Sequence, residues 1–290
     1  MTAASERTGR DVDEAQVELL VRAALEEDLA GGFDVTSSAT VPRDERSAGD
    51  FVARADGVVA GLGVAECTLR LASKGAVQAE RHVEDGAPVR RGDVLLTAHG
   101  PTTALLTAER TALNFLCHLS GIATATRRWA DALVGTGARV RDTRKTTPLL
   151  RVLEKYAVRC GGGVNHRMSL SDEALIKDNH VLAAGGVARA FQRVRGRFPD
   201  LPVQVEVTRL EQIEEALAVG AASILLDNMS TGDMREAVRL VAGRATLEAS
   251  GGLTLDRARE VGDTGVDYLA VGALTHSAPI LDIAFDLRAR

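Results

Sequence analysis

Cationic side chains of several kinds gather between residues 142 and 180. Only four lysines (Lys74, Lys145, Lys155 and Lys177) stand among the 35 lysines and arginines, and three of the four lie in this stretch. A lysine is a compact point charge and an arginine is a planar fork, so the two are not interchangeable at a binding site. The other candidates in the stretch are Arg144, Arg167 and His166, and the sequence leaves open whether His166 is neutral or charged near pH 7. The pattern indicates a site for a small polyanionic molecule, although an arginine-rich composition could also leave a few lysines by chance.

Two carboxylates end apolar stretches in the second half of the chain. Glu206 lies near the end of VQVEV and Asp227 lies at the end of SILLD, and both stretches are predicted strands. Carboxylates at strand ends can hold sugar hydroxyls, bind Mg²⁺ through water or act as general bases. The alternative is that Asp227 caps the following helix and that Glu206 forms a structural ion pair.

Two loops of small residues follow the next two predicted strands. They are Ser250-Gly251-Gly252 and Val271-Gly272-Ala273. Small residues let backbone N–H groups approach an anion, and α/β barrels often bind phosphate after their last strands. Together with the cations and the carboxylates, these loops predict a site that holds a phosphosugar beside a second, carboxylated ligand.

The spacing of these residues predicts the elements that position them. Glu206, Asp227, Ser250 and Gly272 are separated by 21, 23 and 22 residues, which is the repeat of a minimal βα unit. Strand carboxyl ends meet at one rim of an α/β barrel, so we expect these residues to converge there. Further strands are expected near 139–142 and 173–178. About six strands are too few for a complete eight-stranded barrel, and the chain is predicted to form a truncated or open one.

The first 110 or so residues are predicted to form a separate α+β module. Apolar residues at helical spacing predict a helix over 13–29 that ends at Gly31-Gly32. A long helix is expected from about 103 to 135, with a break near Gly121. Short strands are expected over 49–60, 76–83 and 93–98.

The composition argues against several classes of protein. A net charge of −5 and a pI of about 5.8 give no indication of a nucleic-acid or anionic-membrane partner. Three separated cysteines suit neither zinc nor a disulfide framework, and Cys160 is expected to be a small buried thiol rather than a nucleophile. No apolar run approaches the ~20 residues that span a bilayer, and the polar start MTAASERTGRDVDE is unlike a signal peptide. We therefore expect a cytoplasmic protein.

Several segments resemble the quinolinate phosphoribosyltransferase family, and they extend over nearly the whole chain. The central segment, DTRKTTPLLRVLEKYAVRCGGGVNHR at 142–167, is long and specific. The others are ERTALNFLCHLSGIAT (109–124), IKDNH (176–180), VEV (205–207), LLDN (225–228), ASGG (249–252) and DYLAVGALTHS (267–277). The resemblance implies an α/β fold with two domains. One is an N-terminal α/β sandwich domain, residues 1–112, joined by the C-terminal tail 275–290. The other, residues 113–274, is an open barrel of six or seven strands.

The same resemblance implies a reaction and a role for each site residue. The protein would convert quinolinate and 5-phosphoribosyl 1-pyrophosphate, with Mg²⁺, into nicotinate mononucleotide, pyrophosphate and CO₂. Lys145 would hold pyrophosphate, while Glu206 and Asp227 would hold the ribose hydroxyls and Mg²⁺. The loops 250–252 and 271–273 would take the 5-phosphate, with His276 close by. The residues implied to bind quinolinate are Arg110, Thr143, Arg144, His166, Arg167 and Lys177. Arg110 would come from the partner subunit of a homodimer, and whether dimers build a hexamer stays open.

Three other interpretations are compatible with the residues. A relative of the same fold could act on another acceptor, such as the pyrophosphorylase-like proteins found with molybdate transport. Lys145 or Lys177 could form a Schiff base in an aldolase. A non-catalytic sensor could bind a phosphosugar without turnover.

Overall fold

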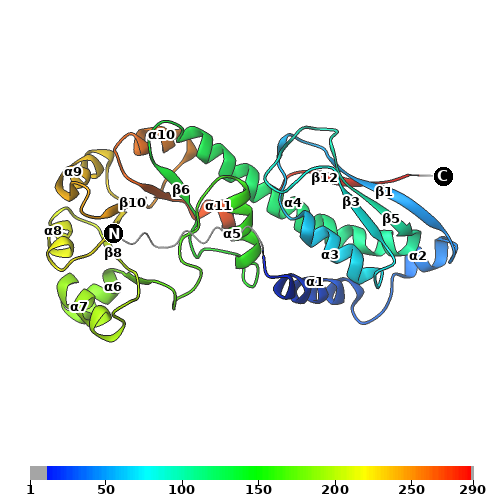
Figure 1. Cartoon of the computed structure of the whole chain (residues 1–290), viewed down its shortest axis with the longest axis horizontal. Helices are drawn as coiled ribbons and strands as arrows, with labels where there is room; N and C mark the ends of the chain where they lie inside the picture. The colour runs from blue at the N-terminus through cyan, green and yellow to red at the C-terminus, as the bar shows by residue number, and fades with distance from the viewer. Residues whose placement is uncertain (1–11, 289–290) are drawn as a thin grey trace. The chain divides into compact units, whose positions relative to one another are not determined.

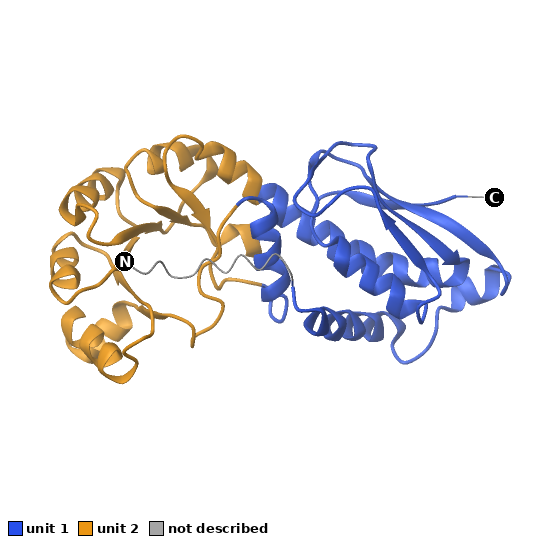
Figure 2. Ribbon diagram, viewed as in Figure 1, with its two compact units in different colours: residues 1–125, 147–162, 277–290 blue, residues 126–146, 163–276 orange. Residues whose placement is uncertain are grey.

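The computed structural model describes residues 12–288, so the polar stretch expected before the first helix lies almost wholly outside the described residues. The chain divides into two compact units (Figure 2). Unit 1 contains residues 1–125, 147–162 and 277–290, and unit 2 contains residues 126–146 and 163–276. The predicted domains, 1–112 with 275–290 and 113–274, were divided on family resemblance rather than on contacts, and they stay a prediction.

Unit 1 is built on a four-stranded antiparallel sheet. Its strand order is β12 (Ile283–Arg288), β1 (Arg46–Ala53), β5 (Val94–Pro101) and β3 (Gln78–Arg81). Phe51 of β1 pairs in register with Leu96 of β5, and both side chains are fully buried in the core. Two shorter strands, β2 (Gly57–Val58) and β4 (Pro88–Val89), pair separately. The strand predicted over 49–60 is therefore two strands, because the chain turns at residues 54–56.

The first helix of unit 1 begins and ends as the sequence predicts. In α1 (Glu14–Leu29), the side chain of Asp13 accepts a hydrogen bond from the backbone N–H of Ala15, which caps the helix. Val17, Val21 and Leu25 are buried at helical spacing. The helix ends at Ala30, whose φ of 48° is left-handed. The other short helices of this unit are α2 (Val35–Thr40), α3 (Leu62–Ala72) and α5 (Arg151–Cys160).

The long helix α4 (Thr102–Ala132) runs without interruption, so the break predicted near Gly121 is wrong. Glycine is required at position 121 for a different reason. A Cβ added at Gly121 would lie 2.2 Å from the carbonyl oxygen of Pro279 and 2.8 Å from Cα of Ile280. The C-terminal segment therefore crosses the helix backbone at a distance that only glycine permits.

Unit 2 contains a six-stranded parallel sheet with helices along its outer side (Figure 1). Its order is β6 (Arg139–Arg141), β11 (Tyr268–Ala270), β10 (Thr246–Ser250), β9 (Ser223–Asp227), β8 (Val203–Val207) and β7 (Ala174–Ile176). Among the described strands, β6 and β7 stand at opposite ends of this order and do not pair with each other. This arrangement confirms an open α/β barrel rather than a closed one.

The helices of unit 2 alternate with its strands as predicted. They are α6 (Asp178–Ala184), α7 (Val187–Arg197), α8 (Glu211–Ala218), α9 (Thr231–Val241), the 3₁₀ turn η1 (Leu255–Arg257), α10 (Ala258–Gly262) and α11 (Ala273–His276). Helices α7 and α8 contact β8, and α10 contacts β11. No helix within residues 12–288 is long and apolar enough to cross a membrane.

The two faces of the parallel sheet differ in chemistry. Val205, Ile224 and Leu247 align across β8, β9 and β10, and all three are buried. The alternate positions, which point to the other face, carry polar side chains: Gln204 and Glu206 on β8, Asp227 on β9, and Glu248 on β10. Period-2 alternation thus separates an apolar face under the helices from a polar face inside the open barrel.

Candidate active site

The predicted rim residues of unit 2 come together at the carboxyl ends of its strands. Ser250 pairs in register with Asp227, and Glu206 pairs with Leu225, two residues before Asp227. Since successive side chains of a strand point to opposite faces, Glu206, Asp227 and Ser250 all lie on the polar face. Gly272 follows β11 after one residue. The convergence predicted from the 21- to 23-residue spacing is therefore present in the fold.

An ion pair links two of the predicted site residues. Lys177 Nζ lies 3.0 Å from Glu206 Oε2, and the two side chains are 48% and 10% exposed. The backbone N–H of Lys177 donates to Nδ1 of His180 at the start of α6. The structural ion pair considered as an alternative for Glu206 does form, but its partner is itself a predicted site residue. The helix cap considered for Asp227 does not form, because Ser230 caps α9.

Two guanidinium groups lie close together after β6 and before β7. Burial lowers the pKa of Arg167, and the positive charge of Arg144 lowers it further, while Glu173 and Asp172 oppose the shift. Nε of Arg144 is buried without a hydrogen-bond partner among the described residues. Two like charges at short range, one of them with an unused donor, are the arrangement expected of a site for an anion.

Lys145 lies against the second glycine loop. A Cβ added at Gly272 would lie 2.9 Å from Cδ of Lys145 and 3.3 Å from Nε2 of His276, so both side chains pass over this glycine. The hydroxyl of Thr275 donates to the carbonyl oxygen of Lys145 at 2.8 Å. The backbone N–H of Lys145 donates to Oγ1 of Thr143 at 3.0 Å. The structure therefore brings Thr143, Lys145, Gly272 and His276 together.

Asn228 follows β9 and lies against the first glycine loop. It was not among the predicted site residues. Its backbone is left-handed, with φ 55°, and its N–H donates to the carbonyl oxygen of Ser250 at 2.9 Å. Its amide donates to Oδ2 of Asp227 at 2.9 Å. A Cβ at Gly251 would overlap this amide, at 2.2 Å from Oδ1. Asn228 thus orients Asp227 and lies against Gly251. The sequence did contain one indication of this role: an asparagine directly follows an apolar strand, and asparagine tolerates a left-handed backbone.

A buried polar cluster fills the interior of the barrel next to His166. Nε2 of His166 lies 2.8 Å from Oε1 of Gln204, and Nε2 of Gln204 donates to Oε2 of Glu248 at 3.2 Å. Arg141 Nη1 donates to the same Glu248 oxygen at 2.7 Å, and its guanidinium lies 4.6 Å from the centre of the Tyr268 ring. None of these four residues, Arg141, Gln204, Glu248 and Tyr268, was among the predicted site residues. The signal was polar residues at alternating positions of otherwise apolar strands.

One predicted site residue, Arg110, and the third lysine of the cationic stretch, Lys155, belong to unit 1. Arg110 is exposed on α4 in unit 1, and its predicted role stays a prediction. Lys155 is fully buried on α5, also in unit 1. The proximity of three lysines in the sequence therefore does not place all three in one site.

Glu206 and Asp227 suit magnesium as a donor set. Within residues 12–288, no group of three or more His, Cys, Asp and Glu side chains could hold a metal ion. Two carboxylates on one face of adjacent strands fit Mg²⁺, because this ion keeps several waters and binds through one or two carboxylates plus substrate phosphates.

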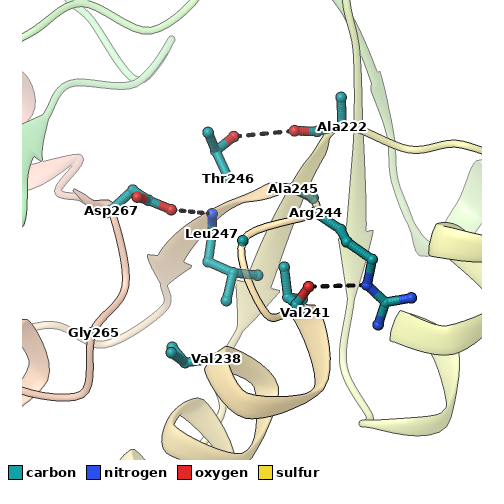
Figure 3. Close-up of a pocket in the computed structure, with 10 residues that line it drawn as sticks. Ala222, Val238, Val241, Arg244, Ala245, Thr246, Leu247, Gly265 and Asp267 are labelled. Carbon is teal, nitrogen blue, oxygen red and sulfur yellow. Dashed lines mark hydrogen bonds between the residues drawn. The ribbon is translucent and has the colours of Figure 1, made fainter.

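A cavity lies at the end of the same sheet opposite the predicted rim (Figure 3). This cavity of about 340 Å³ adjoins the amino-terminal ends of β9, β10 and β11 and includes Arg244, Thr246 and Asp267 in its lining. Asp267 accepts from the backbone N–H of Leu247, and Nε of Arg244 donates to the carbonyl oxygen of Val241. These side chains support the backbone, as is typical of the amino-terminal face of a barrel.

Comparison with known proteins gives consistent matches over both halves of the chain. The family model of the quinolinate phosphoribosyl transferase C-terminal domain matches residues 122–286, and that of the N-terminal domain matches residues 34–120. A nicotinate-nucleotide pyrophosphorylase (carboxylating) of Mycobacterium leprae is 52% identical over 271 residues, which are 92% of this chain and 95% of the relative. A mitochondrial quinolinate phosphoribosyltransferase (decarboxylating) of Nicotiana glauca is 40% identical, over 92% of this chain and 81% of the relative.

Solved structures share the same fold. NadC from Streptococcus pyogenes superposes with a TM-score of 0.91 at 40% identity, over 96% of this chain and 98% of that chain. The nicotinate-nucleotide pyrophosphorylase from Francisella tularensis gives a TM-score of 0.92 at 35% identity, over 96% and 98% of the two chains. With two domain models matched in order and a relative more than half identical over nearly its full length, this chain belongs to the quinolinate phosphoribosyltransferase family.

Proposed function

We propose that this protein catalyses the transfer of a phosphoribosyl group from 5-phosphoribosyl 1-pyrophosphate to quinolinate, with loss of CO₂, to give nicotinate mononucleotide and pyrophosphate. Family membership supports this reaction, and relatives carry the names of the enzyme in both reaction directions. One structural observation supports the proposal most directly. The guanidiniums of Arg144 and Arg167 lie close together at the barrel rim. The same rim contains Glu206, Asp227 and the two glycine loops. One rim thus offers sites for a dicarboxylate and for a phosphosugar.

Quinolinate would bind to the cationic side of the rim. Arg144 and Arg167 suit its carboxylates because guanidinium forks bind carboxylates through two hydrogen bonds. Lys177 would add a point charge, and its ion pair with Glu206 supports a position between the acid and the ribose. His166 lies buried beside Arg167. Thr143 would assist from the loop after β6, and Arg110 would complete the set from the partner subunit of a homodimer.

The phosphoribosyl pyrophosphate would bind to the other side of the rim. Glu206 and Asp227 would hold the ribose hydroxyls and the bound Mg²⁺, and Lys145 would hold pyrophosphate oxygens. The 5-phosphate would lie on the loops of Ser250, Gly251 and Gly252 and of Val271, Gly272 and Ala273, with His276 beside them. Gly251 and Gly252 have φ values of 92° and 58°, and this left-handed backbone can present N–H groups to an anion.

The charges of these residues account for the chemical steps. Departure of pyrophosphate leaves a ribose with oxocarbenium character, which the nearby carboxylates of Glu206 and Asp227 stabilise. Lys145 stabilises the negative charge that develops on the leaving group. Mg²⁺, when bound, neutralises further charge on the pyrophosphate. The ring nitrogen of quinolinate then attacks C1 of the ribose, and Arg144, Arg167 and Lys177 contribute by holding the acid in place.

Decarboxylation follows from the bond that the transfer creates. Once the ring nitrogen is quaternary, the adjacent carboxylate leaves as CO₂ and the electron pair remains on the ring carbon. The positive charge of the pyridinium stabilises this carbanion, and the cations of Arg144 and Arg167 stabilise it further. Protonation of the ring carbon then gives nicotinate mononucleotide.

A Schiff-base aldolase is the interpretation that the geometry disfavours most clearly. A Schiff-base lysine must be neutral to attack a carbonyl, and burial away from acids is what usually provides this. Lys177 instead forms an ion pair at 3.0 Å with Glu206. This ion pair engages the amine that a Schiff base would require, so the geometry disfavours Lys177 in that role.

The deciding experiment is an assay of purified protein with 5-phosphoribosyl 1-pyrophosphate and Mg²⁺. Quinolinate is offered as one acceptor and nicotinate as the parallel control, and consumption is followed by absorbance. We expect quinolinate to disappear with equal amounts of CO₂ and nicotinate mononucleotide formed, and nicotinate to remain. No turnover in folded protein, or preference for nicotinate, would contradict the proposal and favour a relative with another acceptor. Cell fractionation and light scattering would test cytoplasmic localisation and the homodimer against a hexamer.

A further inference from the structure

The protonation of His166 can be read from the groups around its ring. The backbone N–H of Arg167 donates to Nδ1 at 2.7 Å. A backbone N–H is always a donor, so Nδ1 must offer a lone pair and cannot carry a proton. On the other side of the ring, Nε2 lies 2.8 Å from Oε1 of Gln204. A neutral imidazole with an unprotonated Nδ1 carries its proton on Nε2 and donates it there.

The carboxylate of Glu248 requires the same tautomer of His166. The carboxylate of Glu248 accepts from Arg141 at 2.7 Å, and a carboxylate has no hydrogen to donate. The Gln204 group that faces it, at 3.2 Å from the same oxygen, must therefore be the NH₂ group. This fixes the amide of Gln204 with its carbonyl oxygen toward His166. A carbonyl oxygen requires a donor, so Nε2 of His166 must carry the proton.

The cluster is buried well enough for these constraints to hold. Gln204 is fully buried, Glu248 is 1% exposed and His166 is 7% exposed. The charged groups around the ring are Glu248, whose Oε1 lies 3.5 Å from Nε2, and Glu173, whose Oε2 lies 3.7 Å from Nδ1, with Arg167 adjacent and Arg141 behind Glu248. A doubly protonated ring would suit the two carboxylates. It would also set an Nδ1–H directly against the N–H of Arg167, two donors facing each other at 2.7 Å in place of the hydrogen bond that forms there.

We infer that Glu248 and Gln204 are positioning residues that hold His166 as the neutral Nε2–H tautomer. In this role His166 contributes to quinolinate binding by fixing the backbone of Arg167 rather than by offering a charge of its own. This second statement rests on the proposed function. It assigns the neutral form to His166, whose charge the sequence leaves open. The positively charged side chains of unit 2 that would bind quinolinate are then Arg144, Arg167 and Lys177.

The tautomer is tested directly, without an activity assay. The full-length protein is labelled with ¹⁵N-histidine, and the nitrogens of its six histidines are recorded by NMR at the pH of the assay. The His166 signals are identified by their loss in His166→Asn. We expect a protonated Nε2 and an unprotonated Nδ1 in the resting protein. An imidazolium, or a proton on Nδ1, would overturn the inference even if the enzyme is active.

Kinetics of paired variants test the positioning role. Glu248→Gln lets the amide of Gln204 reverse, and Gln204→Met removes both of its hydrogen bonds without a change of charge. We expect kcat/KM for quinolinate to fall by up to about 100-fold in each, the effect of a small misplacement of a binding group. The KM for 5-phosphoribosyl 1-pyrophosphate should change less than about twofold, because the phosphate loops are untouched.

Two substitutions of His166 itself separate positioning from charge. The Oδ1 atom of an asparagine can accept the Arg167 N–H in place of Nδ1, whereas alanine offers no acceptor. We expect His166→Asn to retain at least about tenfold more activity than His166→Ala, the worth of one hydrogen bond of about 1.4 kcal/mol. Equal loss in both variants would overturn the positioning role. An inactive wild-type protein would instead count against the proposed function and leave the NMR result intact.

Discussion

At the scale of single residues, neighbours decide what each ionisable side chain contributes. Lys177 and Lys155 are both lysines of the same short stretch, yet one pairs with Glu206 on the rim and the other is buried on α5. Arg144 and Arg167 repel each other, and a bound anion would relieve this repulsion. The role of a cation in this protein therefore follows from its partners rather than from its type.

Replacement of Lys145 by alanine should reduce kcat by about 100-fold or more, the scale of losing one preorganised electrostatic group. Steady-state assays with both substrates at saturation measure this. Lys74→Ala is the matched control, because Lys74 is exposed in unit 1. Its left-handed φ of 53° adds no new strain in this variant, since alanine carries the same Cβ. Full activity in Lys145→Ala would contradict the assignment of this residue to the leaving group.

Cys160 should react slowly with alkylating reagents. Burial, followed by the charge of Asp85, raises the pKa of this thiol to about 11. Only the thiolate is nucleophilic, and below pH 11 the protonated thiol predominates. At pH 8 we expect alkylation to be about 100-fold slower than for an exposed thiol, with the rate rising as pH increases. Peptide mapping by mass spectrometry after iodoacetamide treatment measures this. The urea-unfolded chain, in which Cys160 should react normally, is the control.

At the scale of elements, glycines mark the places where two segments approach closely. Gly121 lets the C-terminal segment cross α4, and Gly251 makes room for the amide of Asn228. Neither role could be read from the sequence, where a glycine in a helix indicates a break and a Gly-Gly pair indicates a turn. In both cases the constraint comes from a residue that is distant along the chain.

Gly121→Ala should destabilise the protein, although alanine is the better helix former. The clash with Pro279 should cost about 1–3 kcal/mol, which exceeds the gain of about 1 kcal/mol in helix propensity. Gly196→Ala in α7 is the matched control, because no atom lies within 4 Å of the added Cβ and the exposed helix should gain about 0.5–1 kcal/mol. Urea unfolding of the two variants measures the difference. A stabilised Gly121→Ala would show that the C-terminal segment does not cross the helix.

Gly251→Ala should weaken the binding of 5-phosphoribosyl 1-pyrophosphate by about tenfold, equivalent to about 1.4 kcal/mol. Position 251 has a left-handed φ of 92°, which strains an alanine. The added Cβ would also overlap Asn228, so both Asn228 and the loop must move. Gly243→Ala separates the two causes, because it has a φ of 74° with no atom within 4 Å. This control should lose stability and keep its KM. Equal KM values in the two variants would remove Gly251 from the phosphate site.

At the scale of the whole molecule, the chain folds into two units that must both be present for the proposed site. All the predicted site residues lie in unit 2 except Arg110, which is exposed on α4 in unit 1. The proposed homodimer gives this residue a function, since each subunit would lend Arg110 to the site of its partner. The oligomer is then part of the catalytic arrangement.

Mixing two inactive variants should restore activity if the site is shared. Arg110→Ala and Glu206→Ala should each be inactive alone. In a mixture allowed to exchange subunits, mixed dimers contain one site with both residues intact, so about a quarter of wild-type activity should return. A mixture of Arg110→Ala with Lys145→Ala is a second complementary pair and should recover activity in the same way. Glu206→Ala mixed with Lys145→Ala is the negative control: both residues belong to the site of one chain, so every site in a mixed dimer lacks one of them and no activity should return. No recovery in the first mixture would place Arg110 in the site of its own chain.

The sequence by itself determined the alternation of strands and helices, the open six-stranded sheet and the convergence of Glu206, Asp227, Ser250 and Gly272 on one rim. These follow from local periodicity and regular spacing, because parallel strands of a βα repeat present their carboxyl ends together. Tertiary structure alone decided the continuous path of α4 at Gly121, the burial of Lys155 and the tautomer of His166. Each of these depends on contacts between residues far apart in the chain, namely Pro279 for the helix and Gln204 with Glu248 for the histidine. Such contacts leave no periodic trace in the sequence.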